Sequence, residues 1–279
     1  QLEMVKNLNK GDFNETMLSE DYYFKIYGLK NLKMKEQIEN GIKEKFDQTS
    51  DIIKNINWSG EDESYFFYTM LYRNFEFLKE FDKLNNGKFG NKYENVEYFG
   101  INKNTKEEVG EQITVLYYNS KDDFAVLINT KTNDEVIFCK NPNGSNFNEI
   151  YENMENESNK YTGSKSFNKI DEFKAPKLQF DEKRTYNELS GKEFETANHD
   201  IAKIQEAIQT IQFSLDEKGG KIKSEAAISV GVTSVEEKEK EDKPRYFYID
   251  DTFAIFLREK GKEMPYFAGR IENITKFQK

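Results

Sequence analysis

Apolar residues in the first quarter of the chain recur at helical spacing and then give way to shorter, denser runs. Between residues 33 and 56, positions such as Met34, Ile38 and Ile42 fall four residues apart, which predicts one or two amphipathic helices. Residues 65–72 instead form a continuous run of mostly large apolar side chains after a polar break. Such a run is typical of a strand that is buried on both faces.

The rest of the chain predicts mainly strands, because β-branched and aromatic residues alternate there between turns of Asn, Asp and Gly. The predicted strands cover residues 96–99, 113–118, 124–128, 134–139, 170–180, 211–215, 252–257 and 266–271. Short helices are expected at 147–154 and within 200–209, and Gly261 predicts a hairpin between the last two strands. This mixture indicates an α+β fold in a single domain, with a helical part at 1–63 and a sheet-rich part at 64–279.

Composition narrows the classes of function. The net charge of -10 disfavours nucleic acid and anionic membranes as partners, and no apolar run is long enough to span a bilayer. The single cysteine, Cys139, lies in a predicted strand and is expected to be a buried core residue. The single histidine, His199, precedes Asp200 at a polar helix start, and no nucleophile accompanies it. We therefore expect no enzyme activity, no metal site and no cofactor.

A strand, a turn and a second strand follow one another near the C-terminus. The alternating segment 207–215 leads into an acidic, glycine-containing turn at 216–220, and small residues alternate from 224 to 235. In the second strand Ile228 and Val230 fall on one face and Ser229 on the other, as in a strand with one face on a core. The two segments are expected to pair as antiparallel neighbours. The pattern fits either a permanent hairpin or a loop that can enter a sheet.

Five segments resemble serpins, in the order in which that family has them. The matching stretches are the strand that runs from 65 to Phe81-Asp82, the pair 115–118 and 123–128, Ala175-Pro176-Lys177-Leu178, the strand and turn at 207–219, and the hairpin 253–273 with Phe267, Gly269, Arg270 and Asn273. The resemblance implies a central, mostly antiparallel sheet with a second smaller sheet and N-terminal helices. It also implies that the segment after 215 is the hinge of a reactive-centre loop. The hinge residues are then Glu217, Gly219, Gly220, Ser224, Ala226 and Ala227.

The chain also departs from the family pattern. Its N-terminal part is much shorter, the family's corner tryptophan is replaced by Phe77, and Lys221 and Lys223 stand where the hinge has small residues. Aligning the small residues at 224 with the hinge instead costs an insertion in the turn. We interpret the chain as an N-terminally reduced, divergent member, and its richness in Lys, Asn, Ile and Glu suggests a bacterial source.

Two hypotheses on function follow from the resemblance. The first is a non-inhibitory binding or scaffold protein whose loop segment already lies in the sheet. The second is an inhibitor of serine or cysteine proteases with its reactive site in 235–245, although this segment also fits a charged connector. The candidate reactive-site residues are Glu237, Lys238, Lys240, Lys243 and Arg245. Because the chain begins at Gln1 rather than Met, we expect a trimmed N-terminus, an extracellular or cell-surface location, and a protease or another extracellular protein as partner.

Overall fold

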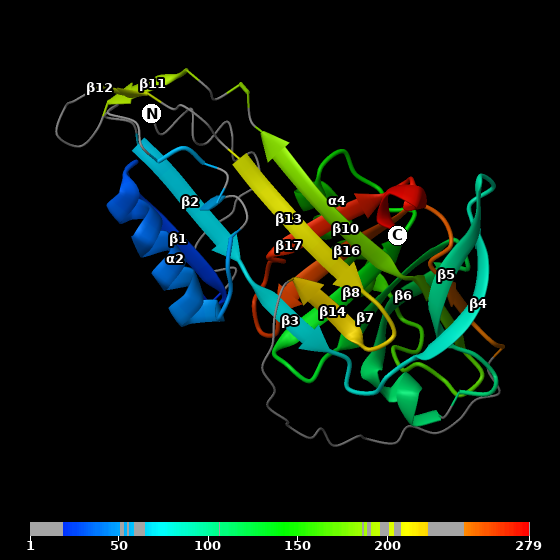
Figure 1. Cartoon of the computed structure of the whole chain (residues 1–279). Coiled ribbons are helices and arrows are strands. Elements are labelled where there is room, and N and C mark those ends of the chain that lie inside the picture. The colour runs from blue at the N-terminus through cyan, green and yellow to red at the C-terminus, as the bar shows by residue number, and fades with distance from the viewer. Residues whose placement is uncertain are drawn as a thin grey trace. The chain divides into compact units, whose positions relative to one another are not determined.

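The computed structural model describes residues 19–50, 53–54, 56–58, 65–105, 107–185, 187–188, 191–195, 201–203, 208–222 and 243–278 (Figure 1). The chain divides into two compact units. The first contains Gln1–Arg73, Asp181–Gln212 and Ile222–Ser224, and the second contains Asn74–Phe180, Phe213–Lys221 and Glu225–Lys279.

A helix packed on a two-stranded sheet forms the described N-terminal part of the first unit. Strand β1 (Tyr23–Leu29), which follows the 3-10 turn η1 (Glu20–Tyr22), pairs antiparallel with β2 (Tyr65–Leu71). Helix α2 (Leu32–Phe46) starts at Asn31, whose side chain accepts a hydrogen bond from the Met34 amide at 2.9 Å. It ends at Asp47, which adopts a left-handed conformation.

The apolar residues of α2, spaced as the sequence predicts, form the core of this part. Met34, Ile38, Ile42 and Phe46 are buried together with residues of β2, and the Trp58 indole donates to the Ile53 carbonyl at 3.0 Å. The strand predicted at 65–72 is confirmed as β2, whereas β1 was not predicted. Its residues, which read Tyr-Phe-Lys-Ile-Tyr-Gly-Leu, interrupt the apolar alternation with one charged residue.

The helix predicted within 200–209 is wrong for the described residues. Ile201–Lys203 form strand β12, which pairs antiparallel with β11 (Glu193–Glu195), and β13 (Ile208–Leu215) begins at residue 208. The reason is visible in the sequence of β13, where Ile208, Thr210 and Ile211 are β-branched and favour extended backbone.

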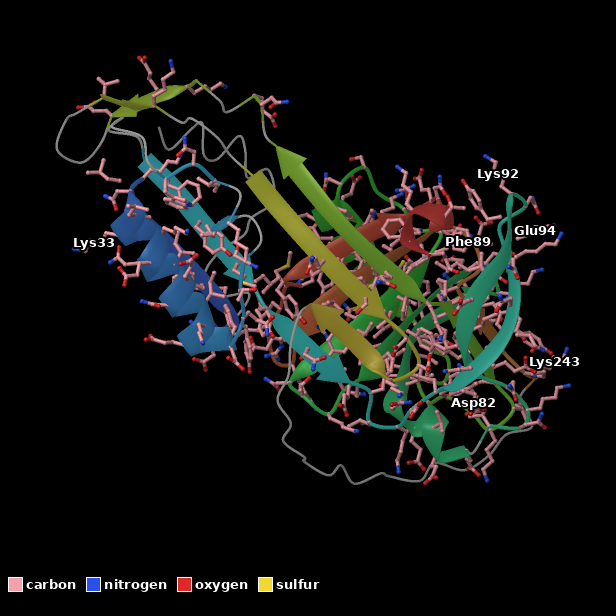
Figure 2. The ribbon with its side chains drawn as sticks, viewed as in Figure 1. Lys33, Asp82, Phe89, Lys92, Glu94 and Lys243 are labelled. Carbon is pink, nitrogen blue, oxygen red and sulfur yellow. The ribbon has the colours of Figure 1, made fainter. Side chains whose placement is uncertain are left out.

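Two sheets and one long helix make up most of the second unit. A four-stranded sheet has the order β15-β9-β5-β4, and its strands are β15 (Tyr246–Tyr248), β9 (Glu172–Pro176), β5 (Tyr93–Ile101) and β4 (Asp82–Phe89). All its pairs are antiparallel except β15 with β9. Figure 2 shows Lys92 and Glu94 at the exposed tip of the β4–β5 hairpin.

The five-stranded sheet has the order β17-β16-β8-β7-β6, and all its pairs are antiparallel. Its strands are β17 (Phe267–Ile271), β16 (Phe253–Glu259), β8 (Asp134–Lys140), β7 (Asp123–Asn129) and β6 (Ile113–Ser120). The predicted hairpin around Gly261, which has a φ of 84°, is confirmed. The short 3-10 helices are η2 (Glu107–Gln112) and η3 (Ile274–Phe277).

Helix α4 (Phe147–Lys160) covers one face of the five-stranded sheet and is longer than the helix predicted at 147–154. Asn146 accepts from the Glu149 amide at 2.9 Å, and the Glu149 carboxylate accepts from the Ser145 amide at 2.8 Å. This reciprocal capping places the helix start after the Pro142-containing turn. Ile150, Tyr151 and Met154 then face a core that contains residues of β6, β7, β8 and β16.

A further four-stranded sheet has the order β10-β13-β14-β3, with β10 (Leu178–Thr185), β14 (Gly219–Ile222) and β3 (Arg73–Glu76). Strand β14 is antiparallel to β13, with Ser214 opposite Lys221 and Leu215 opposite Gly220. The sequence predicts a hairpin here, but the structure makes it tighter: the strand begins at Gly219 and includes Lys221. The residues opposite the end of β13 are therefore not the predicted 224–235.

Candidate functional site

The turn that joins β13 to β14 is held closely by hydrogen bonds of its backbone. The Asp216 amide donates to the Gly219 carbonyl at 2.9 Å, and the Asp216 carboxylate accepts from the Lys218 amide at 2.8 Å. An aspartate that binds the amide two residues further on is a recurrent turn builder. Gly219 has a φ of 153°, which favours glycine. The turn thus needs both its aspartate and its glycine.

Both glycines of the turn pack against β3 with no room for a side chain. A Cβ atom on Gly220 would lie 2.2 Å from the Phe75 ring, and one on Gly219 would lie 2.2 Å from the Phe75 carbonyl oxygen. Phe75 itself is 1% exposed and cannot move into solvent without losing its burial. The first two residues of β14 therefore have to be glycine for the strand to lie beside β3.

Two backbone hydrogen bonds tie the turn to the segment that follows β3. The Phe77 amide donates to the Lys218 carbonyl and the Phe81 amide donates to the Glu217 carbonyl, each at 2.9 Å. Phe77 and Phe81 are buried and pack on each other with their ring centroids 4.9 Å apart. The carbonyls of the turn are thus fixed by a rigid aromatic cluster.

The Glu217 carboxylate is the electrostatic centre of this site, since its side chain is only 5% exposed. Lys177 Nζ lies 2.8 Å from Oε2 and Lys83 Nζ lies 3.2 Å from Oε1. Burial alone would raise the pKa of Glu217, but the two lysines and a backbone hydrogen bond outweigh it and lower the pKa to about 2. The carboxylate is therefore charged at neutral pH and holds the turn on β4, through Lys83, and on Lys177, which lies between β9 and β10.

A second ion pair, between Arg245 and Asp171, holds the chain close to residue 243, where the described residues resume. Arg245 donates to the buried Asp171 carboxylate at 2.7 Å and to the carbonyls of Ser164 and Ser166 at 2.8 and 2.6 Å. Its backbone also takes part, since the Arg245 amide donates to Asp171 at 2.9 Å. We call residues 218–244 the connector, because it joins the Glu217 and Arg245 ion pairs.

The structure brings together three of the predicted hinge residues, Glu217, Gly219 and Gly220. The remaining ones (Ser224, Ala226 and Ala227), the candidate reactive-site residues Glu237, Lys238 and Lys240, and His199 lie outside the described residues. Of the other two candidates, Lys243 is exposed, whereas the Arg245 side chain is 12% exposed and bound to Asp171. A protease pocket could not take up that side chain without breaking its ion pair.

Sequence reasoning missed the partners that complete the site. Lys177 stands in the Ala-Pro-Lys-Leu stretch that carries the family resemblance, but nothing local marks it as a partner of a glutamate 40 positions away. Lys83 and Phe75 carry no sequence signal at all. Asp171 lies at the start of the strand predicted at 170–180, and nothing local marks it as a partner of Arg245.

The predicted state of Cys139 is confirmed. The thiol is 3% exposed, and burial raises its pKa to about 11, so it is a protonated core residue rather than a nucleophile. No cluster of three or more metal-binding side chains occurs among the residues that the structure describes. Within the same residues, every helix is too short or too polar to cross a membrane.

Comparison with known proteins identifies the fold. No protein-family model matches the chain, and no curated protein sequence does. Two solved structures of thyroxine-binding globulin in complex with thyroxine, one of them human, are 12% identical to the chain with TM-scores of 0.50 and 0.51. The matches cover 97% of this chain and 79% and 78% of those chains.

Serpin48 from the insect Tenebrio molitor is also similar, at 14% identity and a TM-score of 0.43, with 96% of this chain and 79% of that one covered. These structural neighbours are serpins. The likeness to the two thyroxine-binding globulin structures shows that the chain has a serpin-like α+β fold, as its sequence predicts.

Proposed function

We propose that the chain is a non-inhibitory binding or scaffold protein of serpin-like fold, in which the segment after β13 is a permanent strand of the sheet. The observation that carries this proposal is the position of β14, which lies between β13 and β3 in the hydrogen-bonded order. An inhibitor that works by strand insertion needs the opposite arrangement, because it stores energy only while the loop is outside the sheet.

The interactions around the turn support a stable rather than a transient insertion. Gly219 and Gly220 let the chain lie directly on Phe75, and the buried Glu217 is paired with two lysines. Releasing β14 would uncover Phe75, on which its two glycines pack. A strand held in this way leaves no reserve of folding energy for deforming a protease.

The register of the observed pair indicates how far the strand could continue. Because Ser214 lies opposite Lys221, an unbroken antiparallel register would set Ile211 opposite Ser224 and Ile208 opposite Ala227. The predicted hinge residues would then pair along the whole of β13. Residues 223–242 lie outside the described residues, so the pairing predicted for 224–235 stays part of the proposal.

A panel of proteases tests the proposal directly. The intact protein is incubated with trypsin-, chymotrypsin- and subtilisin-like serine proteases and with a papain-like cysteine protease, and the products are separated on denaturing gels. We expect cleavage fragments and no complex that survives denaturation. A stable band at the sum of the two masses would favour the alternative, an inhibitor whose reactive site lies at Glu237, Lys238, Lys240 or Lys243.

Cleavage of the connector provides a second test. A Lys-specific protease should nick the charged segment 236–243 first, because no apolar residue anchors it. If β14 is already inserted, the melting temperature of the nicked protein should stay within a few degrees of the intact one. A steep rise after nicking would reveal stored strain and would reject the scaffold role.

Substitutions in the alternating segment 224–235 add a third test. Ile228→Glu or Val230→Glu should lower the melting temperature, since each places a charge on the face predicted to meet the core. Ser229→Glu, on the opposite face, is the matched control and should change it little. Equal losses in all three variants would contradict the alternation.

The extracellular or cell-surface location stays a prediction that fractionation of the source cells can check.

A further inference from the structure

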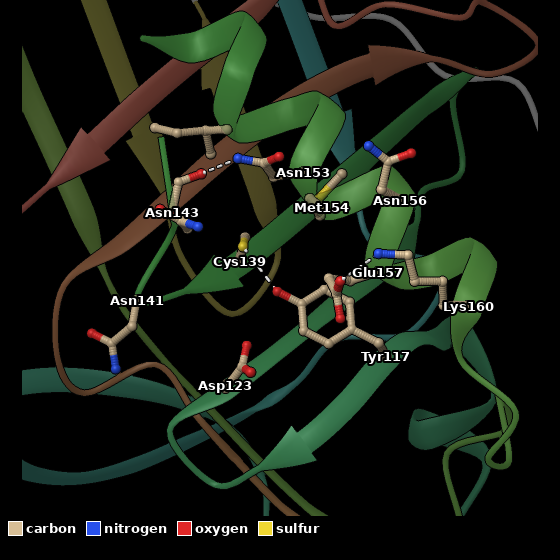
Figure 3. Close-up of a pocket in the computed structure, with 11 residues that line it drawn as sticks. Tyr117, Asp123, Cys139, Asn141, Asn143, Asn153, Met154, Asn156, Glu157 and Lys160 are labelled. Atoms are coloured by element: carbon tan, nitrogen blue, oxygen red, sulfur yellow. Dashed lines mark hydrogen bonds and ion pairs between the residues drawn. The ribbon is translucent and has the colours of Figure 1, made fainter. Parts of the chain in front are cut away.

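A cavity of about 260 Å³ lies between helix α4 and the five-stranded sheet, away from the turn at Glu217 (Figure 3). Its floor comes from facing positions on three neighbouring strands. Tyr117 of β6 pairs with Ala125 of β7, and Ala125 pairs with Cys139 of β8. Since the Ala125 side chain is small, the Tyr117 hydroxyl reaches across it and makes a 3.4 Å hydrogen bond with Cys139 Sγ.

The floor of the cavity is polar but uncharged. Tyr117 and Cys139 are 4% and 3% exposed, and burial is the main cause that raises the pKa of both groups. At neutral pH the phenol and the thiol therefore stay protonated. Ile150 and Met154, on the buried face of α4, give the cavity an apolar wall.

Two carboxylates give the cavity its electrical character. Asp123 stands on β7 and Glu157 on α4, and Figure 3 shows them near the Tyr117 ring. The pKa of Tyr117 is raised mainly by burial, then by the contact with Cys139, and then by the charges of Asp123 and Glu157. The negative potential of both carboxylates therefore reaches the floor of the cavity. Lys160, the cation among the lining residues, is 73% exposed and lies 3.3 Å from Glu157. The lining therefore carries a formal charge of one negative unit.

Side-chain amides surround the carboxylates. Asn141, Asn143, Asn153 and Asn156 all line the cavity. The Asn153 amide donates to the Asn143 carbonyl at 3.0 Å, which fixes that part of the wall, and Asn141 donates to the Asp122 carbonyl at 2.9 Å. The side chain of Asn156 has no hydrogen-bond partner among the described residues, so its amide oxygen and nitrogen can bind a ligand.

We propose that this cavity, the amine pocket, binds a small organic cation: a protonated amine carried on a short apolar body. The ammonium group lies near Asp123 and Glu157 and donates to them and to neighbouring amide oxygens, while the apolar body packs on Ile150 and Met154. The volume suits a ligand of fragment size, below that of most drug-like molecules. The pocket does not involve β14, so it stands or falls independently of the function proposed above.

Three probes of similar shape but different charge test whether the pocket selects a cation. Cyclohexylmethylamine, cyclohexylmethanol and cyclohexanecarboxylate are titrated into the full-length protein at neutral pH, and binding is followed by ligand-detected NMR and calorimetry. We expect saturable binding of the amine and binding of the alcohol and the carboxylate that is at least about tenfold weaker. Equal binding of the amine and the alcohol, or no saturable binding of the amine at millimolar concentration, would overturn the proposal.

Variants test whether the amine binds in this pocket and whether the negative charge of the pocket attracts it. Glu157→Gln and Asp123→Asn should each weaken amine binding about fivefold to tenfold, because each removes one attractive charge. Lys160→Gln should instead strengthen it about twofold or more, since it removes a repulsive charge and frees Glu157. Glu152→Gln, on the exposed side of α4, is the matched control and should leave it unchanged.

Lys160 and Glu157 are partly or mostly exposed, so their variants are expected to fold, and circular dichroism checks this. Amine binding that is unaffected by all three pocket variants would place it elsewhere on the protein and contradict the proposal.

Discussion

Replacing Glu217 by glutamine removes one charge from the turn after β13 while keeping the shape of the side chain. In the folded protein the pKa of Glu217 is lowered to about 2, against 4.5 as the ordinary value of a glutamate. A carboxylate with a lowered folded-state pKa stabilises the fold above its unfolded pKa and loses this contribution as the pH falls through the folded value. The stabilisation is therefore fully present at pH 7 and declines below pH 4.5.

The size of the effect follows from the pKa difference. Each unit corresponds to about 1.4 kcal/mol, so the charged Glu217 contributes about 3 kcal/mol to the free energy of unfolding at pH 7. The same linkage leaves about 1.5 kcal/mol at pH 3. Because the Glu217 side chain is 5% exposed, solvent screens this contribution little, and removing one partner of a buried ion pair commonly costs as much.

Urea unfolding of the wild type and Glu217→Gln, measured at several pH values from 7 to 3, checks both the size and the pH dependence. The matched control is Glu94→Gln, which removes a carboxylate whose ion pair with Lys88 lies at the exposed tip of the β4–β5 hairpin and should have little effect (Figure 2). A Glu217→Gln loss that is equal at pH 7 and pH 3, or no larger than the control, would refute the reasoning.

Three other changes have expected outcomes. Gly220→Ala should destabilise the protein by about 1–3 kcal/mol in urea unfolding, because its methyl group meets the Phe75 ring, whereas Gly261→Ala has open space and pays only for its positive φ. Cys139 should react with thiol reagents at pH 8 only after unfolding, since burial raises its pKa to about 11, and rapid labelling of the native protein would contradict this. Arg245→Met should cost about 3–5 kcal/mol by leaving its aspartate buried and unpaired, and an unchanged melting temperature would show that the ion pair contributes nothing.

Strands were the most predictable part of this fold. The runs at 113–118, 124–128 and 253–257 are apolar on both faces or alternate strictly, and each lies in a strand of the five-stranded sheet. By contrast, β4 reads Asp-Lys-Leu-Asn-Asn-Gly-Lys-Phe, with few buried side chains, and was not predicted. A strand at the edge of a sheet that faces water on most positions lacks the periodic signal on which the prediction depends.

The site was predictable only in its local half. Asp216, Glu217 and the two glycines predict a turn through their own conformational preferences. The length of the turn was not predictable, because Lys221 argues against a strand until the structure shows Phe75 packed on the neighbouring Gly220. Lys177 and Lys83 reach Glu217 only through the sheet pairing of segments far apart in the sequence, which no local pattern encodes.

The two ends of the connector are fixed by the same combination of interactions. At Glu217 and Arg245 alike, an ion pair with a buried carboxylate is accompanied by a hydrogen bond from a backbone amide: from Phe81 to the Glu217 carbonyl, and from Arg245 to Asp171. These backbone bonds do not depend on the charge of Glu217, so Glu217→Gln should weaken the fold without moving the turn. The loss of stability in that variant then measures the ion pair itself rather than a rearrangement of β14.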